Sequence, residues 1–239
     1  MIQPTIFPDH EAMSRHAADW LCERLRQQPE SLISLAAGST PQRLYELLAE
    51  HGRQEPALVA RCRFIKLDEW GGLAMDDPAT CEVQLRRLLI EPLRAAERYT
   101  AFNSRPQNAP AECHRIAAWL AANGPIDVAV LGLGINGHLG FNEPAHALQP
   151  HAHVATLSNE SMQHVMLTET SDQPHFGVTL GMADLLQAKE ILIVANGLTK
   201  RGPMQRLLSG ALTTEFPASL LHLHPQVTLL CDEAACPNR

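Results

Sequence analysis

The sequence predicts an α/β fold: a three-layer α/β/α sandwich around a mainly parallel, Rossmann-like central sheet. Short apolar runs alternate along the chain with segments in which apolar residues recur at helical spacing, which is typical of such a sandwich. The run Ile126 to Leu133 is apolar apart from Asp127 and rich in β-branched residues, as expected for a strand buried on both faces. We find no linker and therefore expect residues 1–239 to form one domain with a large core.

The first half of the chain begins with a helix, a strand and a second helix. Asp9 to Gln27 is predicted to be helical because apolar residues recur every three or four positions, with Asp9 as the N-cap. A short buried strand follows over Ser31 to Ala37, and a helix starts at Pro41, which suits a first helical turn. The same alternation then predicts a strand over 62–70, a helix over 81–93, a strand over 99–103 and a helix over 110–122.

The second half continues the alternation after the central strand. Glu190 to Gly197 is the clearest further strand, because it is almost wholly apolar. The remaining expected elements are a strand over 153–157, a helix over 180–187, a helix opening near residue 199, a helical turn over 217–221 and a last strand over 226–232.

Composition narrows the class of protein. The chain carries 19 Lys and Arg against 26 Asp and Glu, a formal net charge of −7, so it has no electrostatic footprint for nucleic acid. No apolar run approaches the roughly 18 residues of a membrane span, and the amino terminus lacks a secretion signal. We therefore expect a cytoplasmic protein with no nucleic-acid or membrane partner, whose six scattered cysteines are reduced structural thiols.

Small and basic residues at two strand ends suggest an anion site. Gly38, Ser39 and Thr40 form a strand-to-helix turn whose N–H groups and hydroxyls suit an anion at the positive end of the helix dipole, although helix capping explains the same residues. Lys200 lies near the start of another helix, where a bound phosphate would offset its unfavourable position, and a solvated surface lysine is the alternative.

The loop after the central strand carries the chemistry. It sets His138 among four glycines, with Glu143 five residues later, while Asp68 ends another predicted strand. An imidazole with one orienting carboxylate and a second, separate carboxylate is what a proton-shuttling reaction needs. Because carboxyl ends of parallel strands share one edge of a sheet, we expect these residues to meet the anion site.

Two other interpretations of this region are disfavoured. Gly132, Gly134 and Gly137 match the GxGxxG spacing of dinucleotide-binding proteins, but another glycine and a proline follow instead of a helix, and no acidic residue closes the next strand. The histidines at 146, 151 and 153 have no acid or cysteine of ligand spacing nearby, so we expect neither a metal nor a cofactor.

These motifs together resemble the glucosamine-6-phosphate deaminase and isomerase family, which shares a broader fold with 6-phosphogluconolactonase. The resemblance covers nearly the whole chain through AAGSTP, FIKLDEWGGL, LGLGINGHLGFNEP, GVTLGMADLLQAKEILIV and PASLLHLHPQVTLLCDE. Within the family, the chain is most similar to the galactosamine-6-phosphate branch, through KLDEW, DPATCE followed by IEPL, the Asn136 that precedes Gly-His, and QHVML.

The resemblance implies a reaction and a role for each site residue. D-Galactosamine 6-phosphate and water would give D-tagatose 6-phosphate and ammonia, an activity described by the terms hydrolase, isomerase and deaminase. Asp68 would move a proton between C2 and C1, His138 would open the sugar ring, and Glu143 would hold that imidazole. The 6-phosphate would be held by Gly38, Ser39, Thr40 and Lys200.

Departures from the family pattern concern three places. Glucosamine-type members have an aspartate where this chain has Asn136, which can hydrogen-bond but cannot act as a base. The arginine that helps clamp phosphate has no clear counterpart, and His164 is the candidate substitute. The residues of the allosteric site in regulated members are not matched, so we expect no activation by N-acetylglucosamine 6-phosphate.

Three alternative functions follow from the same motifs. They are a glucosamine-6-phosphate deaminase that yields fructose 6-phosphate, a 6-phosphogluconolactonase, and a sugar-phosphate-sensing domain without turnover. The GHLGFNEP loop disfavours the lactonase. In each case the partner is a small phosphorylated sugar, and the sequence leaves C4 preference and homo-oligomer formation open.

Overall fold

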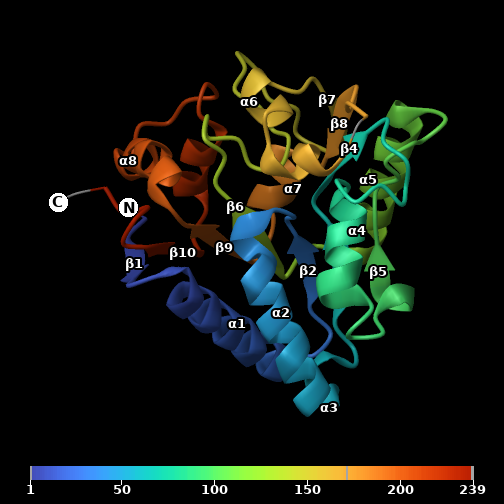
Figure 1. Cartoon of the computed structure of the whole chain (residues 1–239), viewed down its shortest axis with the longest axis vertical. Helices are drawn as coiled ribbons and strands as arrows, with labels where there is room; N and C mark the ends of the chain where they lie inside the picture. The colour runs from blue at the N-terminus through green and yellow to red at the C-terminus, as the bar shows by residue number, and fades with distance from the viewer. Residues whose placement is uncertain (1, 171, 238–239) are drawn as a thin grey trace.

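The computed structural model describes residues 2–170 and 172–237 of the chain. Within these residues the largest sheet has seven strands in the order β1-β10-β9-β6-β2-β3-β5, and every neighbouring pair is parallel (Figure 1). The strands are β1 (Pro4–Phe7), β2 (Leu32–Leu35), β3 (Arg63–Lys66), β5 (Tyr99–Thr100), β6 (Val128–Gly132), β9 (Glu190–Ala195) and β10 (Val227–Asp232).

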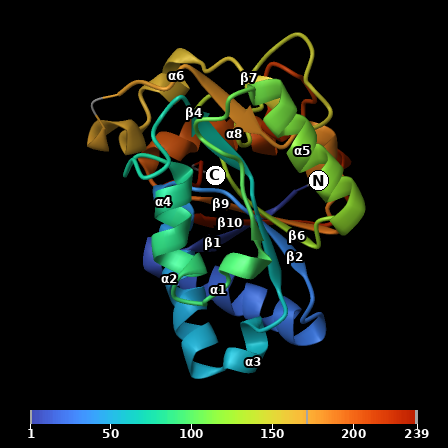
Figure 2. The same cartoon turned by 90° about the vertical axis from the view of Figure 1, so that its right-hand side faces the viewer.

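Helices cover both faces of this sheet, which confirms the predicted three-layer fold (Figures 1 and 2). One layer contains α1 (His10–Gln27), α2 (Ser39–Gln54) and α3 (Pro56–Val59). The opposite layer contains α5 (Ala109–Asn123), α7 (Met182–Leu186) and α8 (Arg201–Leu208). In the part of the chain that the structure describes, no helix has the length and apolar character needed to cross a membrane.

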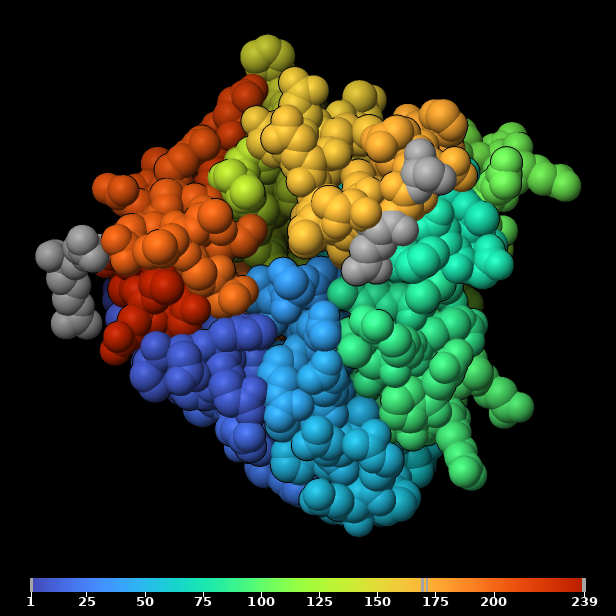
Figure 3. Space-filling model, viewed as in Figure 1, coloured from blue at the N-terminus to red at the C-terminus, as the bar shows by residue number. Residues whose placement is uncertain are grey.

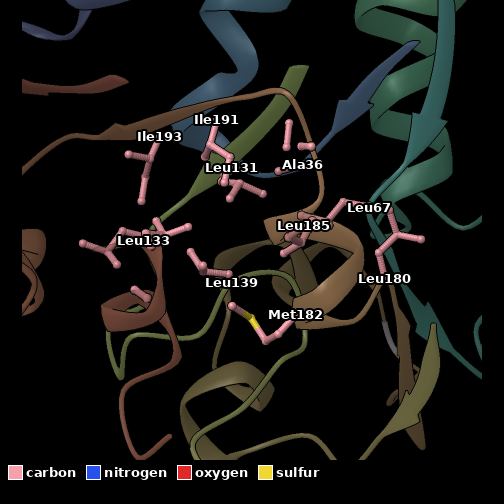
Figure 4. Close-up of a cluster of buried hydrophobic side chains, with 14 of the residues drawn as sticks. Ala36, Leu67, Leu131, Leu133, Leu139, Leu180, Met182, Leu185, Ile191 and Ile193 are labelled. Carbon is pink, nitrogen blue, oxygen red and sulfur yellow. The ribbon is translucent and has the colours of Figure 1, made fainter. Parts of the chain in front are cut away.

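Two hydrophobic cores result from the alternation of side chains along each strand. Ile33 and Leu35 of β2 pack in the core under α1 and α2, whereas Leu32 packs in the core on the α5 side. Figure 4 shows part of the second core, in which Leu131 and Ile191 lie together with side chains from the loop after β6 and from α7. The sheet is therefore buried on both faces, as its apolar strands require.

The first two helices begin close to the predicted positions. The Asp9 side chain accepts a hydrogen bond of 2.8 Å from the Ala12 N–H, which confirms the predicted N-cap of α1. Helix α2 begins at Ser39, two residues before the predicted Pro41, because Gly38 turns the chain with a φ of 115°. Such a backbone conformation favours glycine.

The single strand predicted over 62–70 is wrong. The chain leaves the main sheet after β3, and Asp68–Gly71 forms β4, which pairs antiparallel with β8 (Phe176–Thr179) in a second sheet completed by β7 (His153–Ala155). Leu67 lies at the junction: its N–H bonds the Leu35 carbonyl of the main sheet, and its carbonyl accepts from the Leu180 N–H. Asp68 is thereby placed where the two sheets meet.

Several shorter elements differ from those predicted from the sequence. Strands β1 and β8 were not predicted; the first is four residues long and is followed at once by Pro8. The helix predicted over 81–93 is α4 (Cys81–Leu85) followed by a π-helical segment at Arg86–Ile90. Other helical turns are 3-10 turns at Ala96–Arg98, Val165–Glu169, Leu198–Lys200 and Pro217–Leu223, and a short α6 (Asn159–Met162).

Candidate active site

A pocket lies at the carboxyl ends of β3, β2, β6 and β9, four neighbouring strands of the main sheet. In Figure 3 the light-blue segment after β2 borders the yellow segment around α6 and the orange segment before α8. Open α/β sheets place their ligands at this edge. Seven of the predicted site residues line the pocket: Gly38, Ser39, Thr40, Asp68, His138, His164 and Lys200.

Glu143 and Asn136 lie next to His138 in the loop after β6 and not among the pocket-lining residues. The Nδ1 atom of His138 is 3.3 Å from Oε2 of Glu143. The Asn136 side-chain amide donates to the same oxygen at 2.9 Å, and its carbonyl oxygen accepts from the His138 backbone N–H at 3.1 Å. Asn136 therefore positions both members of the pair.

Two serines near α6 complete this network, and the sequence analysis did not identify them. The Ser161 hydroxyl donates to Oε1 of Glu143 and lies 3.4 Å from Nδ1 of His138. The Ser158 N–H contacts Oε1 of Glu143 at 3.4 Å. The only sequence signal was the helix-capping pattern of SNES, which a structural role explains equally well.

The network keeps Glu143 ionised. Burial raises the pKa of Glu143, but hydrogen bonds and the charge of His138, with further bonds from Ser161 and Asn136, outweigh burial and lower the pKa to about 2. A carboxylate on Nδ1 fixes the orientation of the imidazole and leaves its other nitrogen, Nε2, for a substrate.

The glycine at position 134 makes room for this imidazole. A Cβ atom added to Gly134 would overlap the ring of His138. Gly134 therefore serves a close approach to a side chain, and the loop continues into an isolated bridge between Leu139 and Asn142 in place of a helix. No helix opens between residues 133 and 144, as the sequence predicted.

Asp68 reaches the pocket from the first position of β4. Burial raises its pKa to about 7; the charge of Glu69 adds to the rise and the charge of Lys66 opposes it. A carboxylate with a pKa near neutrality is suited to accept and return a proton. Glu69, which the sequence places beside it, faces away from the pocket and binds Lys66.

The predicted phosphate-binding turn at residues 38–40 is only partly free to bind an anion. The Gly38 N–H donates to the Gln84 side chain at 2.6 Å, and the Thr40 hydroxyl donates to Asn196 at 2.6 Å. In this arrangement the Gly38 N–H is not available, contrary to expectation. Lys200 ends the 3-10 turn after β9 and lines the pocket, and burial lowers its pKa.

His164 lines the pocket but does not replace an arginine as a cation. Burial, with the charges of His138 and Lys200, lowers its pKa to about 4. Its Nδ1 accepts from the Met166 N–H at 3.3 Å, which leaves Nε2 as a neutral donor. The ring centroid lies 5.9 Å from that of Trp70, which both lines the pocket and packs against Phe141.

The three histidines considered as metal ligands have separate partners. His146 faces Glu215 at 3.2 Å, and His151 faces Asp184 at 2.8 Å. The Nδ1 atom of His153 lies 2.9 Å from the His151 carbonyl oxygen.

The fold and pocket define an α/β protein with a pocket at the carboxyl edge of a parallel sheet, lined by a histidine that pairs with one carboxylate and by a separate second carboxylate. A family model described as glucosamine-6-phosphate isomerases/6-phosphogluconolactonase matches residues 8–230. The chain belongs to this family, which confirms the resemblance found in the sequence.

Curated relatives and solved structures agree with this assignment. The chain is 38% identical over 217 residues to a protein of Escherichia coli (strain K12) named "Putative deaminase AgaI", covering 90% of this chain and 86% of that one. It is 35% identical over 238 residues to a glucosamine-6-phosphate deaminase of Rhodopirellula baltica, covering 98% and 95%. The structure of a monomeric glucosamine-6-phosphate deaminase superposes with a TM-score of 0.93 at 29% identity, covering 98% of each chain.

The term hydrolase, expected from the sequence, is wrong for this chain. The curated relatives are named as deaminases, and the family description begins with isomerases. The 6-phosphogluconolactonase of Trypanosoma brucei is similar with a TM-score of 0.75 at 20% identity over 98% of each chain, which shows the fold alone.

Proposed function

We propose that this protein is an amino-sugar-6-phosphate deaminase that also isomerises the sugar, and that its preferred substrate is D-galactosamine 6-phosphate. One observation carries the proposal: His138, which pairs with Glu143, and the separate carboxylate Asp68 line the same pocket. Deaminase relatives over nearly the full chain support the reaction class. The branch motifs around Lys66 and Asn136 support the galacto substrate.

His138 acts first, on the closed sugar ring. Its imidazole takes the proton of the C1 hydroxyl and delivers a proton to the ring oxygen, so that the C1–O5 bond breaks and an aldehyde forms. Glu143 keeps the ring oriented during both transfers, because Nδ1 stays in contact with the carboxylate.

Asp68 then carries the aldose-to-ketose step. Its carboxylate takes the proton from C2 while the C1 oxygen takes a proton from the substrate's own ammonium group at C2, which gives an enolamine. Return of the proton to C1 leaves an imine at C2; water adds to C2, the C–N bond breaks and ammonia leaves. One base serves both carbons because they are neighbours, and a pKa near 7 permits transfer in either direction.

The phosphate anchors the substrate at the opposite side of the pocket. Lys200 supplies the positive charge, and the turn at Ser39 and Thr40 supplies the positive end of α2. His164 adds one neutral N–H donor from Nε2. A phosphate held here lets the sugar extend toward His138 and Asp68.

The test is ammonia release from galactosamine 6-phosphate and glucosamine 6-phosphate, measured side by side at matched concentrations. We expect a higher kcat/KM with the galacto epimer and formation of tagatose 6-phosphate. Preference for the gluco epimer would retain the reaction and overturn the proposed substrate. A glucosamine-6-phosphate deaminase is the second candidate, because the Rhodopirellula relative and the solved structure with a TM-score of 0.93 are glucosamine-6-phosphate deaminases. No ammonia from either sugar would overturn the reaction itself.

A further inference from the structure

A buried ionic cluster lies directly behind Asp68 on the side away from the pocket. The Lys66 ammonium donates to Glu69 at 2.7 Å and to Glu82 at 2.8 Å. The side chains of Lys66 and Glu69 are 0% exposed, and that of Glu82 is 5% exposed. Buried charges are costly unless they are paired, so the three side chains of this cluster are held in fixed positions next to the site.

Backbone groups hold Glu69 in place within this cluster. Its Oε1 accepts from the N–H groups of Trp70 and Cys81, at 2.8 and 2.9 Å, and its Oε2 accepts from the Glu82 N–H at 2.8 Å. Two of these donors are the first residues of α4. The carboxylate is therefore fixed in place by four hydrogen bonds and lies outside the pocket that Asp68 lines.

Glu82 is likewise fully engaged. It accepts from the Tyr99 hydroxyl at 3.0 Å and from Nε of Arg86 at 2.5 Å, besides Lys66. Burial lowers the pKa of Lys66, but the two carboxylates outweigh burial and raise it. Lys66 thus remains an ammonium in the working range of pH.

Titratable groups from several elements surround Asp68. Glu69 and Lys66 come from its own segment, Tyr45 from α2 and Cys81 from α4, and the pKa values of Tyr45 and Cys81 are both raised by burial and by Asp68. The remaining titratable groups on the pocket wall are His138, Glu160, His164 and Lys200. Lys66 is the cation that opposes burial and Glu69 in setting the charge of Asp68.

We propose that Lys66 is a positioning residue whose ammonium locks Glu69 behind Asp68 and so sets the pH above which Asp68 is ionised and able to act as the base. The proposal rests on the proposed function only for the role of Asp68 in turnover. Without Lys66, the charge of the buried Glu69 would act on Asp68 unopposed, and the ionisation of Asp68 would become less favourable. Glu82 has the opposite effect, because it neutralises part of the Lys66 charge. Removing the Glu82 charge should therefore favour ionisation of Asp68.

Three variants test this. In Lys66→Met the midpoint of Asp68 ionisation should rise by about one pH unit or more, a tenfold change in the ionisation constant. In Glu82→Gln the midpoint should fall. Tyr99→Phe, which removes a neutral partner of Glu82, is the matched control and should leave it unchanged. The opposite signs distinguish tuning of Asp68 from general damage to the fold.

The readout is a 13C NMR titration of the aspartate carboxyl carbons in the full chain, with Asp68 assigned from the signal missing in Asp68→Asn. The acid limb of kcat/KM, measured in the same variants, should move in parallel. An unchanged midpoint in folded Lys66→Met, or a rise in Glu82→Gln, overturns the proposal. If Lys66→Met does not fold, the sign of the Glu82→Gln shift decides.

The two readouts also separate this inference from the proposed function. If the wild type releases no ammonia from either sugar, the proposed function fails and the titration still decides whether Lys66 tunes Asp68. If the wild type is active but the titration midpoints do not move, the inference fails and the function stands.

Discussion

Asn136 donates to Glu143 at 2.9 Å, on the same carboxylate oxygen that lies 3.3 Å from Nδ1 of His138. The Asn136 amide thus contacts the His138–Glu143 pair from outside the pocket, because Asn136 is not among the residues that line it. Asn136 is positioned to hold the Glu143 charge and not to distinguish the C4 hydroxyl of one sugar from that of another.

Asn136→Asp should therefore lower kcat without exchanging the preferred substrate. The substitution removes a hydrogen-bond donor to Glu143 that is worth roughly 1.5–3 kcal/mol. It also places a second carboxylate beside Glu143, so the pKa of Glu143 should rise from about 2. We expect kcat at neutral pH to fall about tenfold, with the ratio of kcat/KM for the two epimers unchanged. Steady-state kinetics on both sugars check this, with Asn123→Asp at the end of α5 as control; reversed preference would contradict it.

Asp68→Asn should abolish ketose formation while phosphosugar binding persists. The amide keeps the shape of the carboxylate but cannot accept the C2 proton, and removal of a general base costs about 10²- to 10⁴-fold in rate. Ketose analysis gives the loss and calorimetric titration gives the retained affinity. Asp76→Asn, at an exposed position in the loop after β4, is the control; near-normal turnover of Asp68→Asn would refute the assigned base.

The pH profile should show an acid limb near pH 7. Asp68 works as a base only when ionised, and burial with the Glu69 charge raises its pKa to about 7, so kcat/KM should fall as pH drops below this value. The limb is measured over a range of buffers at constant ionic strength. A limb that stays near pH 4, the ordinary range for an aspartate, would show that another group controls the reaction.

The sequence predicted the sheet and its carboxyl edge well because both depend on strong local patterns. Apolar runs such as 190–197 and the turn at 38–40 need no tertiary information to be recognised. The sequence-based predictions failed where contacts between distant segments determine the structure. The split after Lys66 depends on pairing with β8, more than a hundred residues later, and the role of Ser161 depends on α6 reaching the loop after β6. Neither contact leaves a periodic signal in either segment.

Lys200→Ala should mainly raise KM. Lys200 lines the pocket on the side of the α2 N-terminus, and burial lowers its pKa, so a phosphate dianion would be a favourable partner for its charge. We expect KM to rise at least tenfold and kcat to change less. Lys189→Ala provides the matched control, because Lys189 is half exposed and pairs with Asp127 away from the pocket; an unchanged KM in Lys200→Ala would count against the phosphate role.

Ser161→Ala should slow the ring-opening step while leaving phosphate binding intact. The Ser161 hydroxyl donates to Oε1 of Glu143 and lies 3.4 Å from Nδ1 of His138, so its loss removes a donor that helps to lower the pKa of Glu143 and loosens the orientation of the imidazole. A hydrogen bond to a charged group is worth about 1.5–3 kcal/mol, so kcat should fall by roughly 4- to 13-fold if half of that is specific to the transition state. Because Ser161 contacts Glu143 and His138 and not the proposed phosphate-binding groups, the same change should leave KM within about twofold. Comparison with Ser209→Ala, an exposed serine after α8, separates this effect from the general loss of a hydroxyl. A rise in KM with unchanged kcat would place Ser161 in substrate binding instead.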